Sequence, residues 1–573
     1  MIGGVPTTLP RNAELADQLD LLADLSELLG EQGFRVIAYR RAATRIRETP
    51  GSVAEMALAG TAKDLPGIGR TIEEKLVEVV EKGEMSAVAK RRAEVPEELV
   101  TFLRLPGLGP KTAARIWREL GVSTLGALRE AAEGERLRGL PGLGARSEEK
   151  ILEALRKGIG DDVPRRTPLG VGLPAVLEAA AALRAHPAAI QVSEAGSVRR
   201  RRETFRDLDL IATATDPAAL TAAFVALPFV AEVVAHGDTK ATVISGNGLR
   251  FDLRVVPPES YGNLLQHFTG SKDHNVALRE AAVRQGLSVS EYGITTVETG
   301  AVFTAQTEEE VYAYLGYAFI PPELRENSGE LEAAREGRLP DLVELSDLRG
   351  DLHSHSTWSA DGKSSLEEMA LAARARGYAY LAVTDHSHYL RDGRLELQAA
   401  EIEGLNGRLA PFRLLRGIEA NIRADGSLDV SDETLAGLDW VVASLHTSFD
   451  RSPTERILAA IENPHVDCIG HLTGRRLSRR EGANVDVEKI VERAAATGTA
   501  LEINSQPDRL DLRDTHARLA GEAGVRICID SDGHSTAALG YVELGVAQAR
   551  RAWLTNKQIL NAQPLSRVLK GAR

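Results

Sequence analysis

The chain has 573 residues, of which 43% are hydrophobic, and a formal net charge of −13 at pH 7. Its length predicts several domains, about three to five, and its composition excludes a disordered protein. The negative balance excludes a broadly basic nucleic-acid coat, although a local basic groove stays open. The apolar runs are shorter than the roughly 20 residues of a membrane span, and the first residues lack a signal-peptide pattern. Cys468 and Cys528 lie in apolar runs without metal-type spacing, so we expect a cytoplasmic protein with reduced thiols.

Residues 11–160 predict helices, because apolar residues recur at helical spacing, as in ELADQLDLLADLSELLG. The pattern Leu-Pro-Gly-aliphatic-Gly occurs three times there, in DLPGIGRTIEEKL, RLPGLGPKTAARIW and GLPGLGARSEEKI. Its glycines permit a tight turn and leave backbone N–H groups open at the start of the next helix, where an anion is favoured. One copy would indicate an ordinary helix–turn–helix corner; three copies favour binding to the DNA backbone.

This repeat resembles the helix-hairpin-helix motif of DNA repair proteins. The resemblance implies backbone contacts from these residues: Gly67, Gly69, Gly107, Gly109, Lys111, Gly142 and Gly144.

After RRTPLG at 165–170 the pattern changes to short β-like runs, namely QVSEAGSV, DLDLIATA, AEVVAHG, ATVISG and FDLRVV. We expect an α+β region with an antiparallel sheet. The period of two in DLDL puts Asp207 and Asp209 on one strand face, and Asp252 supplies a third acid from another strand. Three carboxylates together favour a site for two Mg²⁺ or Mn²⁺ ions, because they repel one another without a cation. A solvated strand face is the alternative reading of the DxD pattern.

Four arginines, Arg199–Arg202, stand just before these acids in GSVRRRRETFRDLDL. The run is either a solvated basic patch or part of one site that holds a phosphate and a metal.

Eight acids and three bases make up the charges of residues 323–347, which predicts a solvated linker with some helix.

From Leu348 onward, strand-like and helical runs alternate, which predicts parallel strands with helical crossovers and favours a barrel. Nine of the 13 histidines lie at or beyond His353. Because the strand ends of such a barrel converge on one mouth, we expect a site for several Zn²⁺ or Mn²⁺ ions. The candidate ligands are His353, His355, Asp361, His386, Glu419, His446, His471, Asp532 and His534.

The order GSVRR, DLD, FDLRV and HFTGSKDHNVALR resembles the family X DNA polymerases over most of residues 10–320. The resemblance implies that Asp207 and Asp209 bind both metals and that Asp252 binds the catalytic one. It implies a grip on the incoming dNTP triphosphate by Ser197 and Arg200, next to Gly196 and with help from Arg166. The residues implied near the sugar, the nascent base pair and the template are His267, Phe268, Gly270, Asn275 and Arg279.

Two departures from the family pattern stand out. The family usually has Gly at the positions of Arg201 and Arg206, where an arginine would add phosphate affinity or crowd the pocket. The usual Tyr-Phe pair is His267-Phe268 here, which removes the usual account of discrimination against ribonucleotides.

FRVIAYRRAATRI and the first hairpin resemble the small lyase domain of the same family. Lys75 matches its Schiff-base lysine, and Arg35, Tyr39 and Lys63 match its 5′-phosphate pocket. The alternative is that Lys75 is a helix-surface cation beside two glutamates.

The last region resembles the PHP domain, named for polymerase and histidinol phosphatase, a distorted (β/α)7 barrel. The resemblance implies three metals and a 3′→5′ exonuclease, with abasic-site or 3′-phosphate processing as further options. One metal would be held by His353, His355, Glu419 and Asp532. Glu419 would bridge to a second, with His446 and His471. The third would be held by Asp361, His386 and His534.

We therefore predict an all-α helix-hairpin-helix region, an α+β nucleotidyltransferase palm and thumb, and a (β/α)7 PHP barrel. The predicted boundaries are 1–95 (lyase-like), 96–162 (second hairpin domain), 163–257 (palm), 258–322 (thumb), 323–347 (linker) and 348–573 (PHP). We expect a monomeric, nucleoid-associated DNA polymerase with a metal-dependent exonuclease, acting on gapped or primer-template DNA with a 5′-phosphate. The alternative is a nuclease or phosphatase in which the first 320 residues serve as a DNA-binding scaffold.

Overall fold

The computed structural model describes residues 9–10, 12–31, 34–49, 52–96, 98–103, 105, 108–140, 143–157, 166–478 and 480–571. The chain divides into two compact units, Met1–Arg165 and Arg166–Arg573. The boundaries of the five predicted domains stay predictions, whereas residues 323–347 differ from the predicted linker. No described helix combines the length and the apolar character that crossing a membrane requires.

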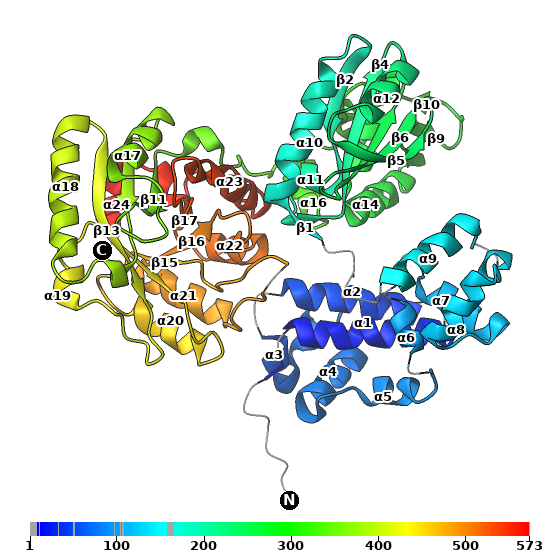
Figure 1. The fold of residues 1–573 in the computed structure, drawn as a ribbon, viewed down its shortest axis with the longest axis horizontal. Coiled ribbons are helices and arrows are strands. Elements are labelled where there is room, and N and C mark those ends of the chain that lie inside the picture. The colour runs from blue at the N-terminus through cyan, green and yellow to red at the C-terminus, as the bar shows by residue number, and fades with distance from the viewer. Residues whose placement is uncertain are drawn as a thin grey trace, which may run out of the picture. The chain divides into compact units, whose positions relative to one another are not determined.

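The first unit is helical where it is described, as its apolar spacing predicts (Figure 1). The interleaved leucines of α1, including Leu15, Leu19 and Leu22, are fully buried in its core. Its helices are α1 (Asn12–Leu28), α2 (Phe34–Glu48), α3 (Val53–Ala59), α4 (Arg70–Lys82), α5 (Ser86–Arg92), α6 (Leu99–Phe102), α7 (Pro110–Leu120), α8 (Leu125–Glu133) and α9 (Ala145–Lys157).

The second unit begins with the palm, a five-stranded sheet in the order β2-β4-β7-β6-β5. The expectation of an antiparallel sheet is wrong at its centre, because β4 and β7 pair in parallel. The run QVSEAGSV is also not one strand. The strand β2 ends at Glu194, and Gly196–Arg199 form a helical turn. The elements are α10 (Leu169–Arg184), β2 (Ala189–Glu194), α11 (Gly196–Arg199), β4 (Asp207–Ala214), α12 (Pro217–Val225), β5 (Val230–His236), β6 (Lys240–Ser245) and β7 (Arg250–Val255). The two-residue strands β1 (Thr167–Pro168) and β3 (Thr204–Phe205) pair beside them.

The thumb follows, with a three-stranded antiparallel sheet. Its elements are α13 (Tyr261–Thr269), α14 (Lys272–Val283), β8 (Leu287–Ser290), β9 (Gly293–Thr296), β10 (Val302–Phe303), α15 (Glu308–Tyr314) and α16 (Glu330–Arg335).

Residues 323–347 are not the solvated linker that their acidity predicts. Leu324, Ala334 and Leu342 are buried in the thumb core, and Val343 is buried in the barrel core. Glu330 is fully buried and accepts bonds from His274 and from two backbone N–H groups. The acids are therefore structural partners, which composition alone does not reveal.

Seven parallel strands in sequence order, β11 to β17, form the last sheet, and helices lie outside it (Figure 1). A parallel bridge between Ser354 and Gly533, and a bond from the Leu352 N–H to Asp530, connect the first strand to the last. The predicted alternation of strands and helices and the barrel are confirmed. The strands are β11 (Gly350–Ser354), β12 (Tyr380–Val383), β13 (Arg413–Asn421), β14 (Trp440–Ser444), β15 (Cys468–Gly470), β16 (Ala500–Asn504) and β17 (Ile527–Asp530). The helices are α17 (Leu366–Ala375), α18 (Arg394–Leu409), α19 (Asp432–Leu435), α20 (Pro453–Ile461), α21 (Val487–Thr497), α22 (Asp514–Glu522), α23 (Val542–Arg551) and α24 (Leu565–Gly571).

The palm and the barrel share a core. Leu510 and Leu544 of the barrel are buried among the apolar residues of α10 and β4. At Gly170 on α10 an added Cβ would lie 2.4 Å from the Pro507 ring, so the two surfaces are in direct contact.

Candidate active sites

The palm sheet brings the three predicted acids together on two neighbouring central strands, β4 and β7. Asp207 and Asp209 alternate with the buried Leu208 and Leu210 on β4, and the parallel register pairs Asp209 with Asp252. Burial, together with the neighbouring carboxylates, raises the pKa of Asp209 to about 7.

An arginine supplies positive charge beside these three carboxylates. Arg250 Nε lies 2.9 Å from Asp252 Oδ2 and 3.6 Å from Asp207 Oδ1, and Thr242 Oγ1 donates to Asp252. Arg250 therefore offsets part of the negative charge of these carboxylates. Their chemistry fits Mg²⁺ or Mn²⁺, which prefer oxygen ligands.

Gly196 and Ser197 open the short helix α11 beside these acids. Gly196 has φ +62°, and a Cβ there would lie 2.1 Å from Asp209 Oδ2. Only glycine permits this approach of the loop to the acid. Arg201, where the family usually has Gly, also has a left-handed φ of 56°. The glycine preference at that position therefore has a backbone reason.

The basic run is largely paired inside the second unit. Arg199 donates to Glu308 at 2.6 Å, Arg200 donates to Glu326 at 3.0 Å and to the Thr269 carbonyl, and Arg201 lies 3.4 Å from Glu194. The run is neither a solvated patch nor a purely phosphate-binding element, because it also ties the palm to the thumb.

Arg166 lies among like charges. It donates to the Thr204 hydroxyl and carbonyl, and burial with the nearby Arg202, Arg206 and Arg200 lowers its pKa. The mutual repulsion of these arginines favours a bound anion at this place.

The remaining predicted nucleotide residues lie on α13, on α14 and, in the case of Gly270, between these helices. His267 Nδ1 is 3.0 Å from an Arg279 nitrogen, and the Asn275 amide donates to the His267 carbonyl at 2.7 Å. Phe268 lies under Arg254, whose guanidinium carbon is 4.4 Å from the ring centroid. At Gly270 an added Cβ would lie 3.2 Å from Arg200.

In the barrel, all nine predicted ligands meet in one cluster around Glu419. Its carboxylate oxygens lie 2.6–3.7 Å from the nearest ring nitrogens of five histidines: His353, His355, His386, His446 and His471. Asp532 lies 3.1 Å from His355, and Asp361 lies 3.4 Å from His386 and 3.2 Å from His534.

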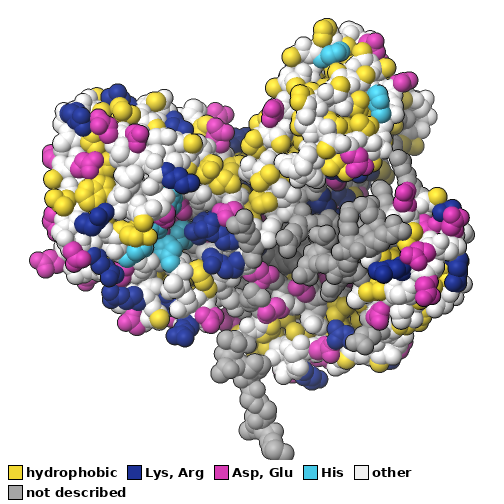
Figure 2. Space-filling model, in the orientation of Figure 1, with side chains coloured by type: hydrophobic (Ala, Val, Ile, Leu, Met, Phe, Trp, Pro, Cys, Tyr) yellow, Lys and Arg dark blue, Asp and Glu magenta, His cyan; other side chains and the backbone are white. Residues whose placement is uncertain are grey.

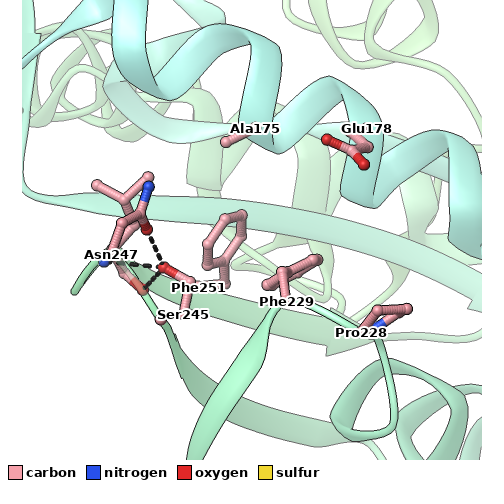
Figure 3. A pocket seen from close by; sticks show the side chains of 9 residues that line it. Ala175, Glu178, Pro228, Phe229, Ser245, Asn247 and Phe251 are labelled. Atoms are coloured by element: carbon pink, nitrogen blue, oxygen red, sulfur yellow. Dashed lines mark hydrogen bonds between the residues drawn. The ribbon is translucent and has the colours of Figure 1, made fainter.

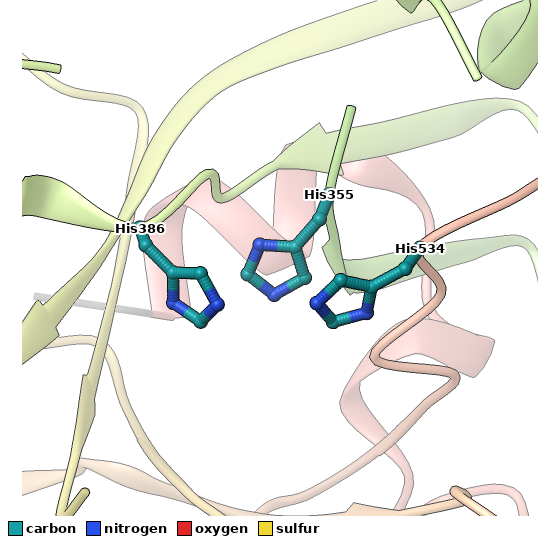
Figure 4. A group of neighbouring side chains, drawn as sticks. All are labelled: His355, His386 and His534. Atoms are coloured by element: carbon teal, nitrogen blue, oxygen red, sulfur yellow. The ribbon is translucent and has the colours of Figure 1, made fainter. Parts of the chain in front are cut away.

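The ligand atoms form three close groups, which are His353-His355-Asp532, His386-Glu419-His446 and His355-His386-His534. Figure 4 shows the imidazoles of the last group facing one another. His386 thus lies with Glu419 and His446 as well as with Asp361 and His534. The assignment of each ligand to an ion stays a prediction.

Some buried imidazole nitrogens in this cluster lack hydrogen bonds. Among the described residues, His353 Nε2 and both ring nitrogens of His355 have no hydrogen-bond partner. Burial, with the nearby His386 and His534, lowers the pKa of His355 to about 4, and burial lowers the pKa of His471 to about 3. Imidazole nitrogens without hydrogen bonds, set among carboxylates, fit Zn²⁺ or Mn²⁺. The histidine group reaches the surface of the barrel beside Lys or Arg side chains (Figure 2).

In the first unit, the hairpin glycines Gly69 and Gly109 are the N-cap residues of α4 and α7, and neither helix start has a side-chain cap. Gly67 has φ +87°, as a tight turn requires. Lys111 lies in the first turn of α7, and Gly144 directly precedes α9. Gly107 and Gly142 lie outside the described residues.

The predicted lyase residues occupy three elements of the same unit. Lys75 is half-buried on α4, Arg35 and Tyr39 lie on α2, and Lys63 lies in the short turn before the first hairpin. The Lys63 N–H donates to the buried Glu73.

A hollow of about 400 Å³ on the palm lies apart from both sites and contains none of the predicted residues (Figure 3). Phe229 and Phe251, with ring centroids 4.8 Å apart, lie beside Ser245 and Asn247, whose side chains are hydrogen bonded.

Known protein families and individual proteins are similar in sequence to this chain over most of its length. Family models match for a helix-hairpin-helix domain at residues 10–85, a helix-hairpin-helix tandem at 99–157, the DNA polymerase beta thumb at 264–326 and the PHP domain at 351–506. The DNA polymerase/3′-5′ exonuclease PolX of Bacillus subtilis (strain 168) is 42% identical over 561 residues, which is 96% of this chain and 97% of that protein. This chain belongs to the PolX family of bacterial family X polymerases.

The barrel of this PolX-family chain also has shorter relatives. A probable phosphatase of Thermoanaerobacter sp. (strain X514) is 31% identical over 37% of this chain and 89% of that protein. One from Acetivibrio thermocellus is 30% identical over 33% of this chain and 81% of that protein.

Several partners of the PolX-family sites were not found from the sequence. Glu502 accepts from His353 Nδ1 at 2.7 Å, and Asn421 Oδ1 lies 2.6 Å from His446 Nδ1, so each fixes one ring. The strand alternation in ALEINS could have indicated Glu502. Glu308 and Glu326 carry no local signal for their bonds to Arg199 and Arg200, because these arginines lie over a hundred residues away.

Proposed function

We propose that this chain is a DNA polymerase that fills short gaps during DNA repair and that its barrel removes nucleotides from 3′ ends. Full-length similarity to a DNA polymerase/3′-5′ exonuclease, in a chain that holds two separate clusters of candidate metal ligands, carries this proposal. We expect it to act as a monomer in the cytoplasm, on nucleoid DNA.

At the polymerase site, Asp207, Asp209 and Asp252 would hold Mg²⁺ or Mn²⁺. Such ions supply charge neutralisation for in-line phosphoryl transfer. Gly196 and Ser197 would offer donors to the incoming triphosphate, and the positive charge near Arg166 and Arg200 would attract it. His267, Phe268, Gly270, Asn275 and Arg279 would line the space for the nucleotide and template.

At the barrel site, the nine candidate ligands, Glu419 included, would hold up to three Zn²⁺ or Mn²⁺ ions. Such ions supply Lewis-acid activation of phosphodiester hydrolysis. Glu502 and Asn421 keep the rings of His353 and His446 in ligand orientation. The probable phosphatases among the relatives of the barrel support phosphoester substrates, and a 3′-phosphate is a second candidate.

In the first unit, the uncapped helix starts at Gly69 and Gly109 support binding of DNA phosphates. We propose that Arg35, Tyr39 and Lys63 bind the 5′-phosphate of a gap. Lyase chemistry at Lys75 is tested by borohydride trapping on a 5′-deoxyribose-phosphate end, and an adduct that persists in Lys75→Ala would remove the assignment.

The central experiment uses a DNA with a one-nucleotide gap and a 5′-phosphate, dNTPs and Mn²⁺ or Mg²⁺. We expect Asp207→Asn to lose extension and keep degradation, and His353→Ala to lose degradation and keep extension. Asp238→Asn, an exposed acid of the palm, and His465→Ala, a barrel histidine outside the cluster, are the matched controls. If wild type never extends the primer, the scaffold hypothesis replaces the polymerase.

A further inference from the structure

The palm segment that follows α11, residues Arg200–Glu203, is held by side chains of the barrel. Arg551 on α23 is 2% exposed and donates to the backbone carbonyl of Arg200 at 2.9 Å. The same guanidinium donates to Glu326 at 3.0 Å and to Asp514 at 2.5 Å. Arg551 therefore fixes the loop directly and is itself fixed from two sides.

The other end of the segment has its own barrel partners. Glu203 accepts two bonds from Arg475, at 2.7 and 3.1 Å, and one from Gln548 at 3.0 Å. Arg475 lies in the loop that also carries His471, one of the predicted barrel ligands. Such a two-pronged arginine–carboxylate pair restrains orientation as well as distance.

These contacts act on the residue proposed to grip the triphosphate. The Arg200 guanidinium bonds to Glu326, and Glu326 also bonds to Arg551. Arg551 thus determines both the backbone position of Arg200 and the place of the carboxylate that orients its side chain. A phosphate-binding arginine held in place this way is preorganised, and losing its support should weaken binding more than chemistry.

We infer that Arg551 and Arg475 of the barrel are positioning residues of the polymerase reaction, which set the affinity for the incoming dNTP through the Arg200–Glu203 loop. This inference rests on the proposed role of Arg200. The barrel then serves the polymerase as a support, independently of the hydrolysis at its metal cluster.

The test measures kcat and KM for dNTP in one-nucleotide gap filling, together with 3′→5′ degradation of single-stranded DNA, in the full chain. We expect Arg551→Met to raise the KM about tenfold or more, corresponding to loss of roughly one hydrogen-bonded charge contact, with a smaller change in kcat. Degradation should stay within about twofold, and Arg551→Lys should recover part of the affinity. Arg550→Met is the matched control, because the neighbouring Arg550 donates to Glu323 and to the Val343 carbonyl and, among the described residues, makes no hydrogen bond or ion pair to the loop.

Glu203→Gln provides a second test that changes no barrel residue, and it should raise the KM in the same direction. If Arg200→Met raises the KM while Arg551→Met and Glu203→Gln leave it unchanged, the inference is overturned and the proposed function stands. If Arg200→Met itself leaves the KM unchanged, the proposed triphosphate grip fails. Equal losses of extension and degradation in Arg551→Met, or no recovery by Arg551→Lys, would mark a merely structural contact and also overturn it.

Discussion

Gly196, at the start of α11, lies against Asp209 on β4 of the palm sheet. Its φ of +62° and the 2.1 Å between an added Cβ and Asp209 leave no room for a side chain. We expect Gly196→Ala to displace Asp209 and lower gap-filling activity about 100-fold, the typical cost of a misplacement near 1 Å. Degradation by the barrel should not change.

Gly246→Ala is the control for this change, because a Cβ there meets nothing within 4 Å and the residue lies in a hairpin of the same sheet. The measurement compares the rates of primer extension by Gly196→Ala, Gly246→Ala and wild type. Full activity in Gly196→Ala would mean that the close approach to Asp209 is not required.

At the level of secondary-structure elements, Glu308 on α15 connects two other segments. Its carboxylate accepts hydrogen bonds from Arg325, in the segment after the thumb, and from Arg199 of the palm. Its side chain is 3% exposed and that of Arg325 is 0% exposed. Removing the carboxylate charge would leave two guanidinium groups with little compensation.

We therefore expect Glu308→Gln to lower the free energy of unfolding of the second unit by about 3 kcal/mol, as measured in urea. Glu309→Gln, at the exposed neighbouring position, should have no measurable effect. A Glu308→Gln protein as stable as wild type would show that this buried network contributes nothing to stability.

His274 gives the thumb a dependence on pH. It is fully buried between Glu330 and Tyr312, with Arg325 and Glu326 nearby, and burial lowers its pKa below the ordinary 6.5. The unfolded chain then binds more protons than the folded one below about pH 6.5, so stability falls as the pH drops.

His274 changes the number of bound protons on unfolding by at most one. Its contribution to the slope of the unfolding free energy against pH is therefore at most about 1.4 kcal/mol per pH unit. Urea unfolding between pH 8 and 5 should therefore show a flatter profile for His274→Gln than for wild type. His236→Gln, which changes an exposed histidine, should follow wild type. Parallel profiles for His274→Gln and wild type would contradict the assignment.

For the whole molecule, the barrel cluster predicts stabilisation by metal. Ions that bind the folded cluster should add about 2.7 kcal/mol at 100 times their Kd, because the ligands come together only on folding. Differential scanning calorimetry should show a higher Tm with Mn²⁺ than with chelator, in wild type and in Asp207→Asn. The increase should shrink in His353→Ala, and an equal increase there would place the stabilising ion elsewhere.

Much of this molecule follows from local pattern. The period of two in DLDL places both acids on one face, and alternation of strands with helices makes the carboxyl ends of β11 to β17 converge, so the clustering of the nine candidate barrel ligands could be predicted. Hairpin glycines likewise indicate uncapped helix starts, since backbone geometry there depends on few residues.

Other features depend on partners far along the chain, and only the tertiary structure decided them. The parallel pairing of β4 with β7 is one, because a strand does not encode the direction of its neighbour. The acids of 323–347 are another, since they look solvated until Arg200, His274 and Arg551 are placed beside them. The four-arginine run itself determined a concentration of positive charge, but its partners Glu308 and Glu326, 109 and 126 residues away, decided that much of this charge joins the palm to the thumb.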